Sequence, residues 1–223
     1  MKPRPDNRVE RLIKKGGAWL PFFFGVITMH VATTDQSDGN SGPPGDLAIW
    51  IFILAEMLVF GVLFVVYAFS RSHQVELFNA SQLTLSRPAG AFNTLVLITS
   101  SYCVVRAVSA IKRDLPAVCV RWLTGTVLLG GAFVAIKLWE FREKYAVGIT
   151  LDTNAFYTFY FTLTFFHFMH VLMGMVILGF VIAKTRRGGY SSHDHIGVET
   201  GASFWHMVDL LWLILFPLVY VIR

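Results

Sequence analysis

Long apolar segments separated by short polar breaks dominate the chain after residue 46. Five of these segments exceed the 18 residues that indicate a membrane-spanning helix. At about 1.5 Å per residue, each helix would cross the roughly 30 Å of hydrocarbon in a bilayer. Proline, glycine, aspartate or asparagine marks the breaks. The pattern predicts an all-α, polytopic membrane bundle with five spans, at residues 47–69, 89–111, 118–141, 155–183 and 202–222.

A sixth apolar run, at residues 18–32, is too short to be predicted as a span. Basic residues that include Lys14 and Lys15 precede it, and a polar linker at residues 33–45 follows it. These features are more typical of a signal-peptide core or an interfacial segment. We therefore divide the chain into an N-terminal extension, residues 1–45, and a membrane domain, residues 46–223.

The distribution of basic residues predicts the topology of the five spans. With the N-terminus inside and the C-terminus outside, thirteen of the 19 Lys and Arg residues fall on the inner side. The positive-inside rule favours this arrangement. A spanning helix at residues 18–32 would instead place the basic N-terminal stretch outside.

Composition supports the membrane class and excludes several others. The chain is 55% hydrophobic and only 15% charged, against about 25% charged in average globular proteins. Its net charge of +5 is spread over the loops, with no basic patch interleaved with aromatic residues, so nucleic acid is not the expected partner. The two cysteines form no CxxC or CxxCH motif, which leaves a disulfide scaffold, a zinc site and c-type haem unsupported.

Glu56 is an ionisable residue in the middle of the first apolar span, in the stretch ILAEMLVF. An unpaired carboxylate in hydrocarbon costs several kcal/mol, so we expect Glu56 to be protonated or paired. Its own helix offers no partner. The residues alone leave two roles open, a structural hydrogen bond to another helix and a proton-handling group.

Three more polar pairs lie within the spans at i, i+3 spacing, which puts both members on one helix face. They are Lys137 and Glu140, His167 and His170, and His206 and Asp209. Lys137 and Glu140 are expected to neutralise each other's charge. If the spans run antiparallel, Lys137, Glu140, His167 and His170 lie in the outer half of the membrane. Glu56, His206 and Asp209 then lie in the inner half. Haem or a metal would need further ligands at matching depth, so interhelical hydrogen bonds are favoured and no haem, copper or iron is expected. Trp205 and Trp212 are predicted to be packing anchors.

Three motifs resemble subunit III of the haem-copper oxidase superfamily. They are IWIFILAEMLVF at residues 49–60, FHFMHV at 166–171 and ETGASFWHMVDLLW at 199–212. The third is the most specific, and the resemblance runs through all five spans from about Gly45. The chain is similar to the five-span short form of the family.

The resemblance implies a non-catalytic membrane subunit that binds no haem or metal itself. It would pack beside a haem-copper catalytic subunit in the bacterial cytoplasmic membrane, hold phospholipid in a cleft and support proton uptake and durable turnover. Glu56 matches the family's buried, carbodiimide-reactive carboxylate, and Glu140 matches a second family glutamate. Lys137 stands where the family would have Gln or Glu. Glu199 is expected to join the interhelical polar network.

Several functions remain open from the sequence. Within the family, the chain is most similar to the accessory protein of nitric oxide reductase clusters, which would place it in denitrification. The alternative is subunit III of a proton-pumping cytochrome c or quinol oxidase. Outside the family, the intramembrane polar residues allow a proton-coupled transporter, although no inverted repeat is evident, and a b-type electron carrier.

Overall fold

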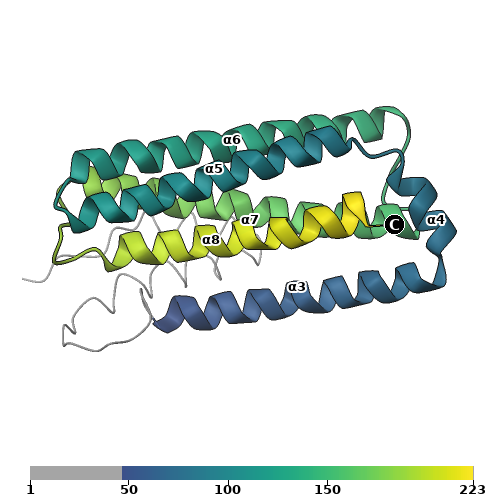
Figure 1. The fold of residues 1–223 in the computed structure, drawn as a ribbon, viewed down its shortest axis with the longest axis horizontal. Helices are drawn as coiled ribbons and strands as arrows, with labels where there is room; N and C mark the ends of the chain where they lie inside the picture. Colours follow the sequence, from purple (N-terminus) through teal and green to yellow (C-terminus); the bar gives the residue numbers. More distant parts are fainter. Residues whose placement is uncertain (1–46, 223) are drawn as a thin grey trace, which may run out of the picture. The chain divides into compact units, whose positions relative to one another are not determined.

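The computed structural model describes residues 47–222, and every regular element among them is a helix. The all-α prediction is confirmed for this part of the chain (Figure 1). The chain divides into two units, residues 1–42 and 43–223. The predictions for the 18–32 segment and the polar linker lie outside the described residues. The elements are α3 (Leu47–His73), α4 (Val75–Gln82), α5 (Arg87–Lys112), α6 (Pro116–Ala146), α7 (Ala155–Arg186), α8 (Ile196–Phe216) and the π-helical turn η1 (Pro217–Val221).

Five of the described helices are long and apolar enough to cross a membrane, which confirms the predicted spans. Each helix continues beyond the apolar segment that predicted it, because polar residues at the ends also adopt helical geometry. The last span departs from the prediction of one regular helix. Pro217 has no backbone N–H, so the α-helix ends before it, and the N–H of Ile222 donates instead to the Pro217 carbonyl at 2.9 Å.

The short helix α4 was not predicted, because its sequence VELFNASQ has no apolar periodicity of useful length. It connects α3 to α5 at one end of the bundle, which we call the α4 end (Figure 1). Phe78 of α4 is fully buried, and Gln82 donates through Nε2 to the Val219 carbonyl at 3.0 Å. These contacts attach α4 to the C-terminal turn.

Helix α8 occupies the centre of the bundle and contacts α3, α5 and α7, while α5 and α6 pack as an antiparallel hairpin. In the most apolar part of α8, 56% of residues are buried, against 11% in α3. Helix α3 is therefore peripheral. At the end opposite α4, short loops join α5 to α6 and α7 to α8 (Figure 1).

Trp205 of α8 is wedged between α6 and α7 at two glycines. A Cβ added to Gly130 would lie 2.7 Å from the Trp205 ring, and one added to Gly174 would lie 2.9 Å from it. The indole Nε1 donates to the Ser100 hydroxyl of α5 at 2.9 Å. One side chain thus joins all four central helices, as small residues permit when membrane helices approach closely.

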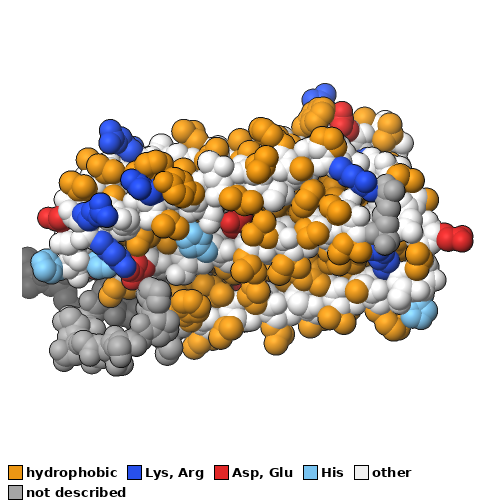
Figure 2. Space-filling view, in the orientation of Figure 1, with side chains coloured by type: hydrophobic (Ala, Val, Ile, Leu, Met, Phe, Trp, Pro, Cys, Tyr) orange, Lys and Arg blue, Asp and Glu red, His pale blue; other side chains and the backbone are white. Residues whose placement is uncertain are grey.

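The long sides of the described bundle are apolar. Figure 2 shows hydrophobic side chains along its length and most charged ones towards the two ends. Large exposed side chains on the outer helices include Leu54, Leu128 and Phe165. Apolar sides with charged ends suit a bundle surrounded by lipid.

We expect Gly174→Leu to destabilise the bundle by about 1–3 kcal/mol, because the new side chain overlaps the Trp205 ring. The measurement is the unfolding transition of the purified chain in detergent. Gly179→Leu is the matched control on the same helix, because a Cβ there meets nothing within 4 Å. Equal stability of the two variants would contradict the role given to the Trp205 wedge.

Candidate functional site

Glu56 of α3 has a partner from α7. Its Oε2 lies 3.0 Å from Nε2 of His170, and the two side chains are 19% and 8% exposed. Nδ1 of His170 lies 2.8 Å from the Phe166 carbonyl oxygen one turn earlier. The aromatic rings of Phe60 and Phe166 pack against the imidazole. The pair is thus held in an apolar setting between two helices.

Hydrogen-bonding rules define the proton content of this pair. A carbonyl oxygen only accepts, so Nδ1 of His170 carries a hydrogen. One further proton must then lie between His170 Nε2 and Glu56 Oε2. It makes either a neutral acid beside a neutral imidazole or a carboxylate beside an imidazolium. In both arrangements the pair is neutral overall, so the proton can change sides without a net charge appearing in the membrane.

The contact corrects the predicted depths of these residues. Glu56 and His170 were assigned to opposite halves of the membrane, yet they lie side by side. The prediction assumed that the ends of the two antiparallel helices lie level. In the structure α7 continues past the predicted span to Arg186, which puts His170, the sixteenth of its 32 residues, at its centre. Glu56 lies four residues before the centre of α3.

Lys137 and Glu140 form the ion pair that their spacing suggested, with Nζ and Oε2 2.9 Å apart. Lys137 also donates to the Tyr220 hydroxyl at 2.6 Å. Glu140 accepts through Oε1 from Tyr220 at 2.7 Å and from Tyr160 at 2.9 Å. All four residues are buried, with at most 2% of Glu140 exposed. This Lys137–Glu140 cluster joins α6, α7 and η1 towards the α4 end.

Aromatic faces surround the buried ammonium of Lys137. Its Nζ lies 4.8 Å from the Trp212 ring centroid and 5.1 Å from that of Tyr220. Cation–π attraction of this kind is worth about 2 kcal/mol when the groups are desolvated. Together with the carboxylate, these rings compensate a charge that would otherwise be costly in an apolar core.

The predicted pair of His206 and Asp209 is not bonded as a pair. Nδ1 of His206 lies 2.7 Å from the Ser101 hydroxyl of α5. Oδ1 of Asp209 is buried, and within residues 47–222 it has no hydrogen-bond partner. The same holds for both ring nitrogens of His167, which packs between Phe133 and Trp212. His170 and His206 therefore make interhelical hydrogen bonds, as predicted. His167 makes none within the described residues and contacts its neighbours through aromatic packing.

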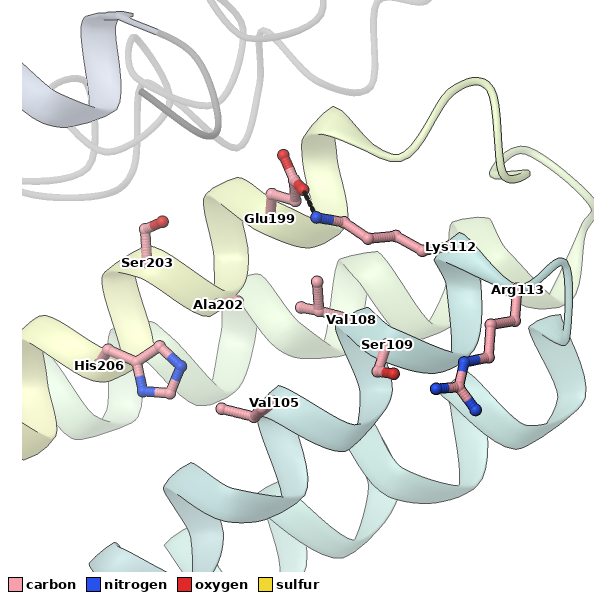
Figure 3. A pocket seen from close by; sticks show the side chains of 9 residues that line it. All are labelled: Val105, Val108, Ser109, Lys112, Arg113, Glu199, Ala202, Ser203 and His206. Atoms are coloured by element: carbon pink, nitrogen blue, oxygen red, sulfur yellow. Dashed lines mark ion pairs between the residues drawn. The ribbon is translucent and has the colours of Figure 1, made fainter. Parts of the chain in front are cut away.

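Glu199 lies near the start of α8, at the end opposite α4. It accepts from Lys112 of α5 at 2.7 Å and lies 3.4 Å from Nε2 of His195 (Figure 3). Trp205 and Trp212, the predicted packing anchors, are both buried and donate to Ser100 and Thr94. The sequence-based list omitted Tyr160, Tyr220 and Ser101. A lone tyrosine or serine in a span carries no spacing signal.

No group of three or more His, Cys, Asp or Glu residues suited to holding a metal ion occurs in the described part of the chain. The expectation that haem and metal belong to a partner therefore stays a prediction. The expected structural phospholipid stays a prediction as well.

Comparison with known proteins identifies the family. The profile described as "Cytochrome c oxidase subunit III" matches residues 45–222. Cytochrome c oxidase subunit 3 of Thermostichus vulcanus is 33% identical over 178 residues, covering 79% of this chain and 86% of that protein. The corresponding subunit of Synechocystis sp. is 31% identical over 194 residues, covering 85% and 82%. Heme-copper oxidase subunit I+III of Aeropyrum pernix is 27% identical over 181 residues, covering 78% of this chain and 22% of that longer protein.

These relatives are oxidase subunits, and they give no support to the predicted association with nitric oxide reductase and denitrification. The match extends over all five long helices, and it includes the Glu56–His170 and Lys137–Glu140 pairs. The chain belongs to the cytochrome c oxidase subunit III family.

Proposed function

We propose that this chain is a non-catalytic subunit III of a proton-pumping cytochrome c or quinol oxidase in the bacterial cytoplasmic membrane. It supports the assembly, stability and sustained turnover of a haem-copper catalytic subunit. The observation that carries the proposal is the family match over the whole membrane bundle, residues 45–222. The Aeropyrum relative, named as subunit I+III, adds support because its name joins this region to subunit I in one protein.

The internal polar groups fit a supporting subunit. Lys137 and Glu140 compensate each other in a closed cluster, and Glu199 is paired with Lys112. Loss of either member of the buried Lys137–Glu140 pair would leave an uncompensated charge in the core, which is a structural requirement, whereas the Lys112 side chain of the second pair is 51% exposed. Redox chemistry is accordingly assigned to the partner, where haem and copper are expected.

The Glu56–His170 pair supports a role in proton handling. It holds one proton between the two side chains, at the level of the middle of α7, and the Glu56 side chain remains 19% exposed. A partner's proton pathway could exchange this proton while the pair stays neutral. Of the two roles that the sequence left open for Glu56, we therefore favour proton handling.

The first test is copurification. An affinity-tagged chain, expressed in its own organism and extracted in mild detergent, is expected to elute with a haem-containing catalytic subunit. The measurements are the optical spectrum, oxygen consumption and identification of the eluted subunits. Elution without haem would contradict the proposed function. Elution with a nitric oxide reductase would restore that alternative.

The second test concerns Glu56. A hydrophobic carbodiimide reacts with a protonated acid in an apolar setting, so it should label Glu56 before the exposed Glu76 and Glu143. Glu56→Gln keeps the side-chain shape but cannot release a proton. We expect the complex with Glu56→Gln to assemble normally and to lose turnover rate or lifetime. Glu76→Gln is the matched control. Wild-type turnover and lifetime in the Glu56→Gln complex would assign Glu56 a structural role.

The third test concerns the stabilising role of the Lys137–Glu140 cluster. Lys137→Met leaves the Glu140 carboxylate without its cation and should destabilise the chain by roughly 3–5 kcal/mol. Adding Glu140→Gln removes the unpaired charge, so the double variant should recover much of that loss in detergent unfolding experiments. Arg142→Met, at an exposed position of the same helix, controls for the loss of a positive charge. A double variant as unstable as Lys137→Met alone would show that the pair is not the cause.

A further inference from the structure

A groove lies between α5 and α8, at the end of the bundle opposite α4. Its volume is about 540 Å³, and it leads from the loops inward to His206 (Figure 3). Both helices contribute to its wall. We call it the α5–α8 groove, and its inner wall is formed by Val105, Val108, Ser109, Ala202, Ser203 and His206.

Polar side chains line the groove at a depth where lipid acyl chains offer no hydrogen-bond partner. His206 follows the start of α8 by ten residues, or about 15 Å, which is half of a bilayer's hydrocarbon core. Its Nδ1 lies 2.7 Å from the Ser101 hydroxyl, whereas its Nε2 makes no hydrogen bond to another described residue. A half-buried histidine facing acyl chains is unfavourable, so such residues face protein or water.

The other sides of the bundle differ from this one. The exposed mid-span positions of α6 and α7 include large apolar side chains, such as Leu128 and Phe165, which suit lipid contact. The groove is thus a polar interruption in an apolar surface.

Small residues line the groove where another helix could approach. Ser109, Ala202 and Ser203 leave little side-chain bulk, and neither serine hydroxyl makes a hydrogen bond to another residue within 47–222. Interfaces between membrane helices are enriched in small residues, which let backbones come close, and in Ser and His side chains, which bond across them.

Charge at the loop end favours an acidic group. Lys112 is paired with Glu199 at 2.7 Å, but Arg113 has no ion-pair partner in the described chain (Figure 3). The groove therefore carries one positive charge in excess at this end. A carboxylate of a partner at this level would balance it.

We propose that the α5–α8 groove docks a transmembrane helix of the catalytic subunit. That helix would present a hydrogen-bonding side chain at the depth of His206 and a carboxylate near Arg113. A phospholipid could satisfy the charged end but offers only hydrocarbon at His206. The inference rests on the proposed function and adds the surface through which the chain joins its partner.

Site-specific photo-crosslinking in native membranes tests the contact. A photoreactive amino acid replaces Ser109 or Ser203 in the groove, or Ala132, an exposed mid-span control on α6. We expect the groove positions to crosslink to the haem-bearing subunit and Ala132 not to. Crosslinks only to lipid, or only to residues 1–46 of the same chain, would overturn the inference. So would crosslinking to the catalytic subunit from Ala132 alone.

Bulky substitution tests its importance for assembly. Ser203→Leu and Ser109→Leu fill the groove without removing an internal hydrogen bond, so the variants should unfold like wild type in detergent. We expect the haem that copurifies with each to fall at least tenfold, and Ala132→Leu to leave it unchanged. Undiminished haem with both groove variants overturns the inference but leaves the proposed function intact. If wild type copurifies with no haem, the proposed function fails and the inference fails with it.

Discussion

The insertion of Trp205 between two glycines is the constraint on which the bundle depends. Without a Cβ at Gly130 and Gly174, α6 and α7 can both approach the indole ring, and its N–H reaches Ser100 of α5. Four helices are thereby held at one level around a single rigid side chain. In lipid, where apolar burial does little to drive helix association, close packing and hydrogen bonds of this kind supply the stability.

The position of α8 set by this wedge brings the polar groups to their partners. Directly after Trp205 in the sequence, His206 reaches Ser101 across the α5–α8 seam. Further along, Trp212 covers the ammonium of Lys137, and the Pro217 break turns the chain so that Tyr220 contacts both Lys137 and Glu140. A regular α-helix through Pro217 would have carried Tyr220 on a different course. The break in the last helix is therefore part of the Lys137–Glu140 cluster.

Sequence patterns predicted the elements better than the contacts between them. Hydropathy found the five spans because each apolar segment is long enough to be unambiguous, and i, i+3 spacing found the Lys137–Glu140 pair because both residues share one helix. The contact of Glu56 with His170 depends on how two antiparallel helices are aligned, which the order of residues in one helix does not reveal. For the same reason, the bonds of His206 to Ser101 and of Glu140 to Tyr220 could not be predicted.

The two ends of the described bundle are built for different tasks. Towards the α4 end, the Lys137–Glu140 cluster is buried and its charges are compensated internally, so it has nothing to offer a partner. The α5–α8 groove opens at the other end, where Arg113 has no ion-pair partner in the described chain, and leads inward to the Nε2 of His206, which has no hydrogen-bond partner there either. The supporting role that we propose requires a stable body and a specific contact surface. The placement of Lys137 in one region and of the α5–α8 groove in another separates these two requirements, so that a change in the groove can weaken assembly without weakening the fold.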